Sequence, residues 1–192
     1  MVDATQSFGA IEINVKKCNI SLLGASCYKW PLAGFGNGFL YVSEELLKTY
    51  PPKSAGYNSC IWEDCISVYQ PSMKSYEPGH HDHVTFHRLG FALQTIKELG
   101  QDFIYLRITE LMDYLIEQLQ EAQISIVGDF YNENRLGILA IESKEGLFQH
   151  LLSKRVEASE RGGNIRIGVH YYNTEEDVDV FVKEVNNFTL SS

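Results

Sequence analysis

Apolar residues at helical spacing between residues 101 and 121 constrain the fold of this chain more than any other feature. They recur every three or four positions, which puts them on one face of a helix: Ile104, Ile108, Leu111, Leu115 and Leu119. A helical period already begins near Val84, and Gly100 marks the break between two helices. This stripe therefore opens a second region of the chain.

The residues after the stripe alternate between strand and helix patterns. Apolar runs predict strands at 124–127, 136–141 and 164–169, and a short helix is predicted around 146–152. Thr174 opens a last helix, because threonine is a good N-cap and the three acidic residues after it suit the positive end of a helix dipole. This order predicts an α/β or α+β unit.

The first part of the chain has short apolar runs separated by glycine and proline. These runs predict strands at 20–25 and 39–42. Ser43 is an N-cap candidate for a short helix that Pro51 and Pro52 end. We expect an extended loop over residues 53–78, where glycine, serine, tyrosine and proline are frequent.

The composition excludes several classes of partner and location. The chain has 192 residues and a net charge of −9, and its few basic residues are scattered, which argues against nucleic acid. No apolar run reaches the roughly 18 residues of a membrane span, and the N-terminus lacks the order of a signal peptide. We therefore expect a cytoplasmic protein. Its four cysteines form no CxxC pair, so we expect mostly buried, reduced thiols rather than disulfides or zinc: Cys18, Cys27, Cys60 and Cys65.

Lys29 is the residue whose surroundings most favour chemistry. It lies between Tyr28 and Trp30, after an apolar run and before a glycine-rich turn. Partial burial there favours a neutral, nucleophilic amine. The same side chain can instead extend its charged end into solvent, so the local pattern leaves both interpretations open.

Three motifs give the chain a resemblance to a known family. They are Val-Asp-Ala-x-Gln-x-x-Gly from residue 2, Ser-x-x-Lys-Trp from residue 26 and Phe-Gly-x-Gly-Phe-Leu-Tyr-Val-Ser from residue 35. Together they resemble the pyridoxal-phosphate site of the class V aminotransferases, which include cysteine desulfurases and isopenicillin N epimerase-like proteins. Segments 76–80 and 161–176 also resemble this family, so the similarity covers nearly the whole chain.

The resemblance implies an α/β architecture, the C-terminal part of a fold-type I transferase that depends on pyridoxal 5′-phosphate. Residues 1–88 would form the end of the large cofactor-binding domain, and residues 89–192 a small α+β domain. It also implies an amino-acid substrate and a homodimer. The family's phosphate loop and ring-stacking aromatic precede the aspartate, so we expect them outside this sequence, either because the chain is truncated or because another polypeptide supplies them.

The resemblance also implies a role for each site residue. Lys29 would form the Schiff base with the cofactor and move protons at the substrate's α carbon. Asp3 would hold the protonated pyridine nitrogen, Gln6 the phenolic oxygen and Ser26 the phosphate. Arg166 would hold the substrate carboxylate in a two-pronged contact. Taken singly, each of these residues also fits a cap, a turn or a strand-edge charge.

Two positions depart from the family's pattern. Tyr28 stands where many relatives have histidine, and His80 stands where many have a threonine that reaches the phosphate of the other subunit. The histidines at 80–83, with His87, allow a metal interpretation, but helix caps and dimer contacts fit this segment better.

The reaction and the chain's activity stay open at this point. Cysteine desulfurases need a nucleophilic cysteine shortly before the substrate arginine, and no cysteine follows Cys65. We therefore expect an aminotransferase, epimerase or lyase of amino acids rather than persulfide chemistry. The alternative is a non-catalytic remnant, or a dimerising module, of the same fold.

Overall fold

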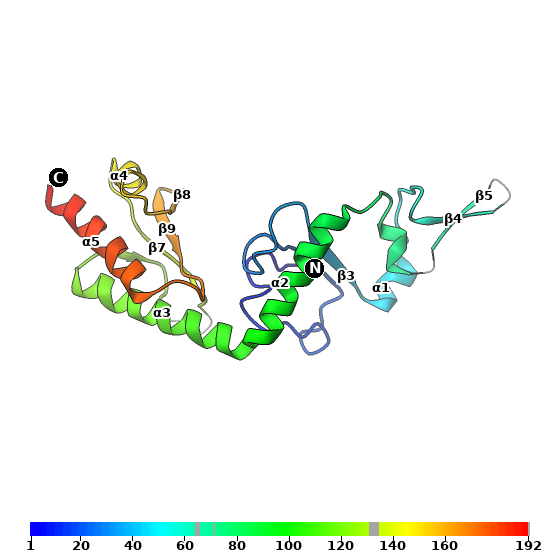
Figure 1. Ribbon diagram of the computed structural model, residues 1–192, viewed down its shortest axis with the longest axis horizontal. Coiled ribbons are helices and arrows are strands. Elements are labelled where there is room, and N and C mark those ends of the chain that lie inside the picture. The colour runs from blue at the N-terminus through cyan, green and yellow to red at the C-terminus, as the bar shows by residue number, and fades with distance from the viewer. Residues whose placement is uncertain (64–65, 71, 131–134, 192) are drawn as a thin grey trace. The chain divides into compact units, whose positions relative to one another are not determined.

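The chain forms two compact units, Met1–Gln101 and Asp102–Ser192, each described here by itself (Figure 1). The computed structural model describes residues 1–63, 66–70, 72–130 and 135–191. The boundary expected between residues 88 and 89 falls within a helix, α2 (His83–Leu99), whereas the two units divide just after its end. No helix in the described part of the chain combines the length and apolar character that crossing a membrane requires.

A three-stranded sheet organises the first unit. Its order is β1-β2-β3, with bounds β1 (Val2–Asp3), β2 (Leu22–Ser26) and β3 (Gly38–Val42). β1 runs parallel to β2, with Asp3 opposite Gly24, whereas β3 is antiparallel to β2. Parallel strands end at the same edge of a sheet, which is where α/β proteins place ligands. The residues that follow β1 and β2 therefore meet at one edge.

Two further elements of the first unit test the sequence predictions. α1 (Glu44–Thr49) begins after Ser43, whose Oγ accepts a hydrogen bond from the Leu46 N–H at 3.3 Å, so the predicted cap is confirmed. The prediction of an extended loop over residues 53–78 is wrong. This segment contains a hairpin and one 3₁₀ turn: β4 (Cys60–Glu63), β5 (Ile66–Tyr69) and η1 (Met73–Tyr76).

Helix α2 packs on the loop that follows β2. Leu89 and Ala92 of the helix are buried against Cys27 and Ala33 of that loop. The Asn37 side chain ties the two together, since its amide donates to the carbonyls of Ala33 at 3.0 Å and Thr85 at 3.2 Å. The loop is therefore held by a helix on one side.

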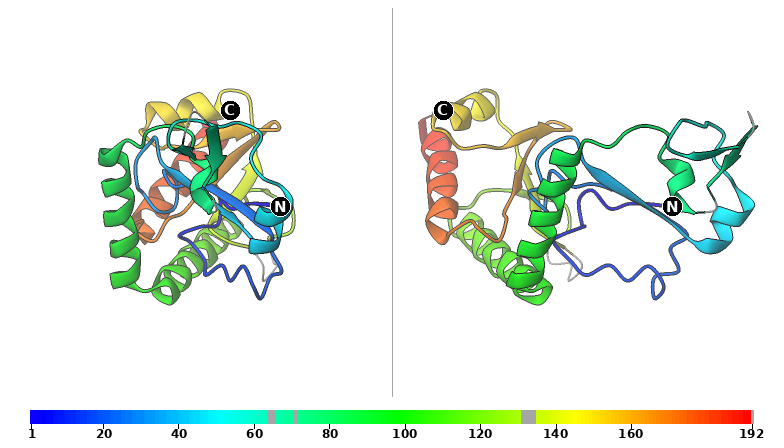
Figure 2. Two further views of the ribbon diagram at one scale, coloured as in Figure 1. Left: turned by 90° about the vertical axis from the view of Figure 1, so that its right-hand side faces the viewer. Right: turned by 45° about the vertical axis from the view of Figure 1, so that its right-hand side comes forward.

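The second unit has a four-stranded antiparallel sheet with helices on one face (Figures 1 and 2). The sheet order is β6-β7-β9-β8, with bounds β6 (Ile126–Val127), β7 (Ile138–Glu142), β8 (Ser159–Arg161) and β9 (Asn164–Gly168). The helices are α3 (Gln101–Glu121), α4 (Leu147–Ser153) and α5 (Glu175–Ser191). All the predicted elements are present, and β8 is an addition that the sequence analysis missed.

One core joins these helices to the sheet. The predicted stripe of α3 is fully buried, and its residues from Leu111 onward pack in one cluster with Leu139 and Ile141 of β7, Ile165 and Ile167 of β9 and residues of α4 and α5. Alternate residues of a strand point to opposite faces, so Arg166, between two core residues, lies on the face away from the helices. Gly100, at the break before α3, has φ +87°, which glycine adopts without strain.

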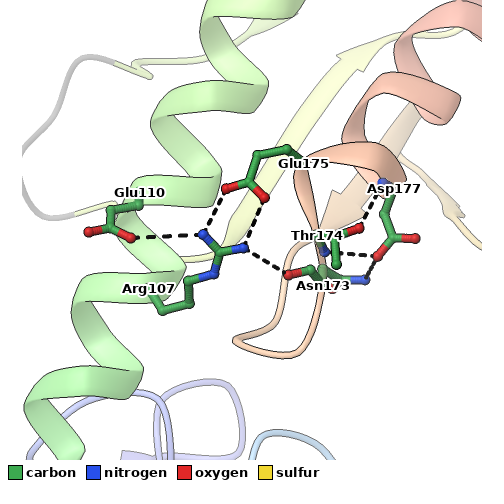
Figure 3. A network of polar contacts seen from close by, with 6 residues as sticks. All are labelled: Arg107, Glu110, Asn173, Thr174, Glu175 and Asp177. Atoms are coloured by element: carbon green, nitrogen blue, oxygen red, sulfur yellow. Dashed lines mark hydrogen bonds and ion pairs between the residues drawn. The ribbon is translucent and has the colours of Figure 1, made fainter.

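An ion pair fixes the start of α5 against α3 (Figure 3). Nη1 and Nη2 of Arg107 donate to the two carboxylate oxygens of Glu175 at 2.8 and 3.2 Å, and Nη2 also donates to the Asn173 carbonyl. Thr174 and Asp177 form a reciprocal cap, because the Asp177 N–H donates to Thr174 Oγ1 and the Thr174 N–H donates to Asp177 Oδ2. The Thr174 cap predicted from the sequence is confirmed.

We expect this ion pair to make stability depend on pH. The hydrogen bond from Arg107 is the main cause that lowers the pKa of Glu175 from 4.5 to about 2. The folded state is thus stabilised at pH values above 4.5, and this contribution is lost as the pH falls from there toward 2. Glu175→Gln should lower the melting temperature near neutral pH and flatten its fall in acid, as measured by circular dichroism.

A matched control for this experiment is Glu176→Gln. Glu176 is exposed, and its side chain has no hydrogen-bond or ion-pair partner among the residues that the structure describes. Its pH profile should follow that of the wild type. If Glu175→Gln kept the wild-type profile instead, the ion pair would have no part in acid stability.

The buried stripe of α3 gives a second stability prediction. Leu119 is fully buried in the core of the second unit. Leu119→Ala should lower the free energy of unfolding by about 2–5 kcal/mol, through lost apolar contact and the cavity left behind. Urea denaturation measures the change, and the exposed Glu117→Ala on the same helix should shift it by less than about 0.5 kcal/mol.

Candidate functional site

A short chain of hydrogen bonds connects the residues at the end of β1 with those at the end of β2. The Ala4 N–H donates to the Gly24 carbonyl at 2.8 Å and extends the parallel pairing by one residue. The Thr5 N–H donates to Asp3 Oδ1 at 2.9 Å, and Thr5 Oγ1 accepts from the Ser26 N–H at 3.1 Å. Thr5 therefore connects two residues that the sequence placed in the site, Asp3 and Ser26.

Asp3 is held as a carboxylate at this edge. Hydrogen bonds from the side chain and the backbone of Thr5 are the main causes that lower the pKa of Asp3; burial opposes them, and the positive charge of Lys29 makes the smallest contribution. Asp3 ends β1 and Lys29 lies in the loop after β2, so both belong to the edge where the two parallel strands end.

The loop after β2 presents Lys29 between two buried anchors. Cys27 is fully buried and Trp30 is 6% exposed, whereas Lys29 between them is half-buried. The Ala33 N–H donates to the Cys27 carbonyl at 3.0 Å and closes the turn. The Lys29 Nζ lies 5.7 Å from the centre of the Tyr28 ring, within the range of a cation–π contact.

Glycine is required where the loop after β1 touches the loop after β2. Gly9 has φ +93°, and a Cβ at this position would lie 3.0 Å from the Pro31 nitrogen. A larger residue would therefore be strained and would also push the Lys29 loop away. This contact explains the final glycine of the first motif.

Gln6 and Ser26 are exposed at the same edge. Neither side chain has a hydrogen-bond partner within the described part of the chain, so both are open to a ligand. Thr5 is the residue that the sequence analysis missed. The available signal was Asp-x-Thr, because an aspartate often accepts from the backbone N–H two residues later in a turn.

Arg166 lies in the second unit, in the middle of β9 and opposite Ala140 and Ser159 on the neighbouring strands. Its Nε donates to Ser159 Oγ at 3.2 Å. Its terminal nitrogens have no partner among the residues described, which leaves a two-pronged guanidinium surface free.

The histidine segment before α2 forms a helix cap and surface contacts. Asp82 caps the helix, since its Oδ1 accepts from the Val84 N–H at 2.9 Å. His81 Nε2 lies 3.0 Å from a Glu77 carboxylate oxygen, and the exposed His80 stacks on Tyr57. Among the described residues, no group of three or more histidine, cysteine or acidic side chains could hold a metal ion. The predicted cap is confirmed.

The cysteines differ in exposure. Cys27 and Cys60 are buried as predicted, and burial raises the pKa of the Cys27 thiol, which makes it a poor nucleophile. Cys18, in contrast, is exposed. Cys65 lies outside the described residues.

The chain belongs to the class-V aminotransferase family, since residues 1–181 match that family. It is 28% identical to an uncharacterized aminotransferase, YcbU, of Bacillus subtilis over 98% of this chain and 51% of that protein. It is 25% identical to a probable cysteine desulfurase of Pyrococcus abyssi over 95% of this chain and 50% of the relative. The chain thus spans about half the length of these curated relatives.

The solved structures confirm the predicted fold class. An apo cysteine desulfurase from Thermococcus onnurineus NA1 matches all of this chain and 52% of its own with a TM-score of 0.91, at 21% sequence identity. The chain therefore has the mixed α/β fold of part of a fold-type I protein. Family and fold together imply pyridoxal 5′-phosphate as the cofactor.

We expect Thr5 to control the charge of Asp3. Thr5→Val removes the hydroxyl that contributes most to the lowered pKa, so the pKa of Asp3 should rise toward its ordinary value. Carbon-13 NMR titration of the Asp3 carboxyl measures this change. Thr5→Ser keeps the hydroxyl and should keep the wild-type titration, and an unchanged pKa in Thr5→Val would rule out the role of the hydroxyl.

Proposed function

We propose that this chain provides part of a pyridoxal-phosphate site that acts on an amino-acid substrate, with Lys29 as the point of cofactor attachment. The observation that carries the proposal is the placement of Asp3 at the end of β1 and of Lys29 in the loop after β2, because these two parallel strands end at the same edge of the sheet. An ionised carboxylate, an amine and a free hydroxyl converge there. This donor set fits a cofactor with a protonated ring nitrogen, an aldehyde and a phosphate.

Each residue has a distinct proposed task toward the cofactor. When bound, pyridoxal phosphate supplies an electron sink for the α carbon of an amino acid. Asp3 would hold the protonated ring nitrogen, and Thr5 supports this task by keeping Asp3 ionised. Ser26 would donate its hydroxyl to the phosphate, and the Gln6 amide would donate to the phenolic oxygen. Both side chains are exposed at the edge that Asp3 occupies.

Lys29 would carry out the proton transfers. Its amine would hold the cofactor through the aldehyde, and with a substrate bound it would remove or return a proton at the substrate's α carbon. The buried anchors Cys27 and Trp30 on either side fix the backbone from which it acts. Arg166 would bind the substrate carboxylate through its free terminal nitrogens.

For the reaction we propose transamination, epimerisation or lyase chemistry of an amino acid. The relatives' names include both aminotransferase and cysteine desulfurase. Persulfide transfer needs an accessible cysteine near the substrate arginine, but Arg166 lies in a unit whose sequence has no cysteine. A homodimer and a cytoplasmic location stay predictions.

The decisive experiment traps the cofactor on the lysine. The purified chain is incubated with pyridoxal 5′-phosphate, reduced with borohydride and digested, and mass spectrometry locates the modified lysine. We expect modification at Lys29, a matching visible absorbance band before reduction, and loss of both in Lys29→Ala. Lys16→Ala, at an exposed lysine of the same unit, should behave as the wild type.

The folded state is checked by circular dichroism in the same samples. If the chain is well folded and no modification depends on Lys29, the proposal fails. The result would then favour the alternative, a non-catalytic or dimerising module of the same fold.

A further inference from the structure

We propose that the second unit contains a binding site for a free α-amino acid with an apolar side chain, separate from the residues assigned to the cofactor. The site is a cavity of about 330 Å³ between β9, α5 and the segment that follows α4. All its lining residues belong to the second unit. The inference does not depend on the proposed cofactor site.

The floor of the cavity is apolar. It is made by residues of α3, β9 and α5 that also belong to the core of the unit, among them Leu115, Ile167, Val169 and Phe181. Each of these is at most 8% exposed. The apolar surface that a ligand could cover comes mainly from two more exposed lining residues, Tyr172 and Val180, which are 60% and 50% exposed.

The rim of the cavity is charged, with one cation and two anions. Arg155 and Glu157 line it, and neither side chain has a hydrogen-bond or ion-pair partner within the described ranges. Asp177 lines it as well, and its carboxylate is held by the Thr174 N–H and the Asn173 side chain (Figure 3). These hydrogen bonds lower the pKa of Asp177, so it is ionised at neutral pH.

This charge pattern matches a zwitterion. Arg155 suits the ligand's carboxylate, and Glu157 with Asp177 suits its ammonium. A ligand with only a carboxylate would be repelled by the two acids, and one with only an amine would lack the attraction of Arg155. The class of ligand that satisfies both signs and the apolar floor is an α-amino acid such as leucine.

The backbone of Arg155 gives independent support. Its φ is +61°, in the left-handed region that strains a residue with a side chain. Arg155 lies in the turn that ends α4. In this turn the Arg155 N–H donates to the Leu152 carbonyl and the Val156 N–H donates to the Leu151 carbonyl. Glycine is the usual residue at such a position. Strain retained at a charged cavity residue indicates a role for the side chain.

The test is methyl-detected NMR of the full chain carrying Lys29→Ala and purified without cofactor. In this background, chemistry at Lys29 cannot contribute, so the result is independent of the proposed function. L-leucine should shift the methyl signals of Ile167, Val169 and Val178, which line the cavity. Two matched probes, 4-methylpentanoate without the amine and 3-methylbutylamine without the carboxylate, should bind at least about tenfold more weakly.

Variants separate binding from folding. Arg155→Gly should raise the melting temperature, because it relieves the left-handed strain, and still weaken leucine binding at least about tenfold. Glu157→Gln should weaken binding as well, whereas Arg161→Gln, at a cation outside the cavity, should not. The proposal is overturned if leucine gives no shifts, if either single-charge probe binds as well as leucine, or if Arg155→Gly binds leucine as tightly as its parent.

Discussion

The parallel pairing of β1 with β2 is the constraint on which the candidate cofactor site depends. With Asp3 opposite Gly24, the residues after each strand emerge at the same edge. One hydrogen bond, from the Ser26 N–H to Thr5 Oγ1, then fixes the two exits against each other. The carboxylate and the lysine are far apart in the chain, and this pairing places both at the same edge of the sheet.

The two units differ in how their apolar residues are packed. The second unit is built on an amphipathic helix, α3, whose buried face joins α5 and the sheet in one continuous core. The first unit instead has small clusters around short strands, and it places polar residues at a strand edge. This division lets one part of the chain be rigid through packing while the other presents side chains on loops that a few buried anchors hold.

Much of the fold could be predicted from the sequence, because strong local patterns decide it. The α3 stripe, the Gly100 break and the Thr174 cap depend on residues close in the chain. The β4–β5 hairpin was missed, since its four-residue strands give little period and its glycine- and proline-rich flanks predict a loop. The motifs named Asp3, Ser26 and Lys29. Asp-x-Thr could have indicated the bond from Thr5 to Asp3, but the bond from Ser26 to Thr5 joins residues that only the folded sheet brings together.

The contact between Gly9 and Pro31 has a consequence for how this edge can evolve. A side chain at position 9 would meet the proline ring and its backbone nitrogen. Because every residue has a backbone nitrogen, no substitution at position 31 would remove this contact. A single change at position 9 would therefore misplace the lysine loop without touching the lysine, so this edge can keep its lysine and still lose its geometry.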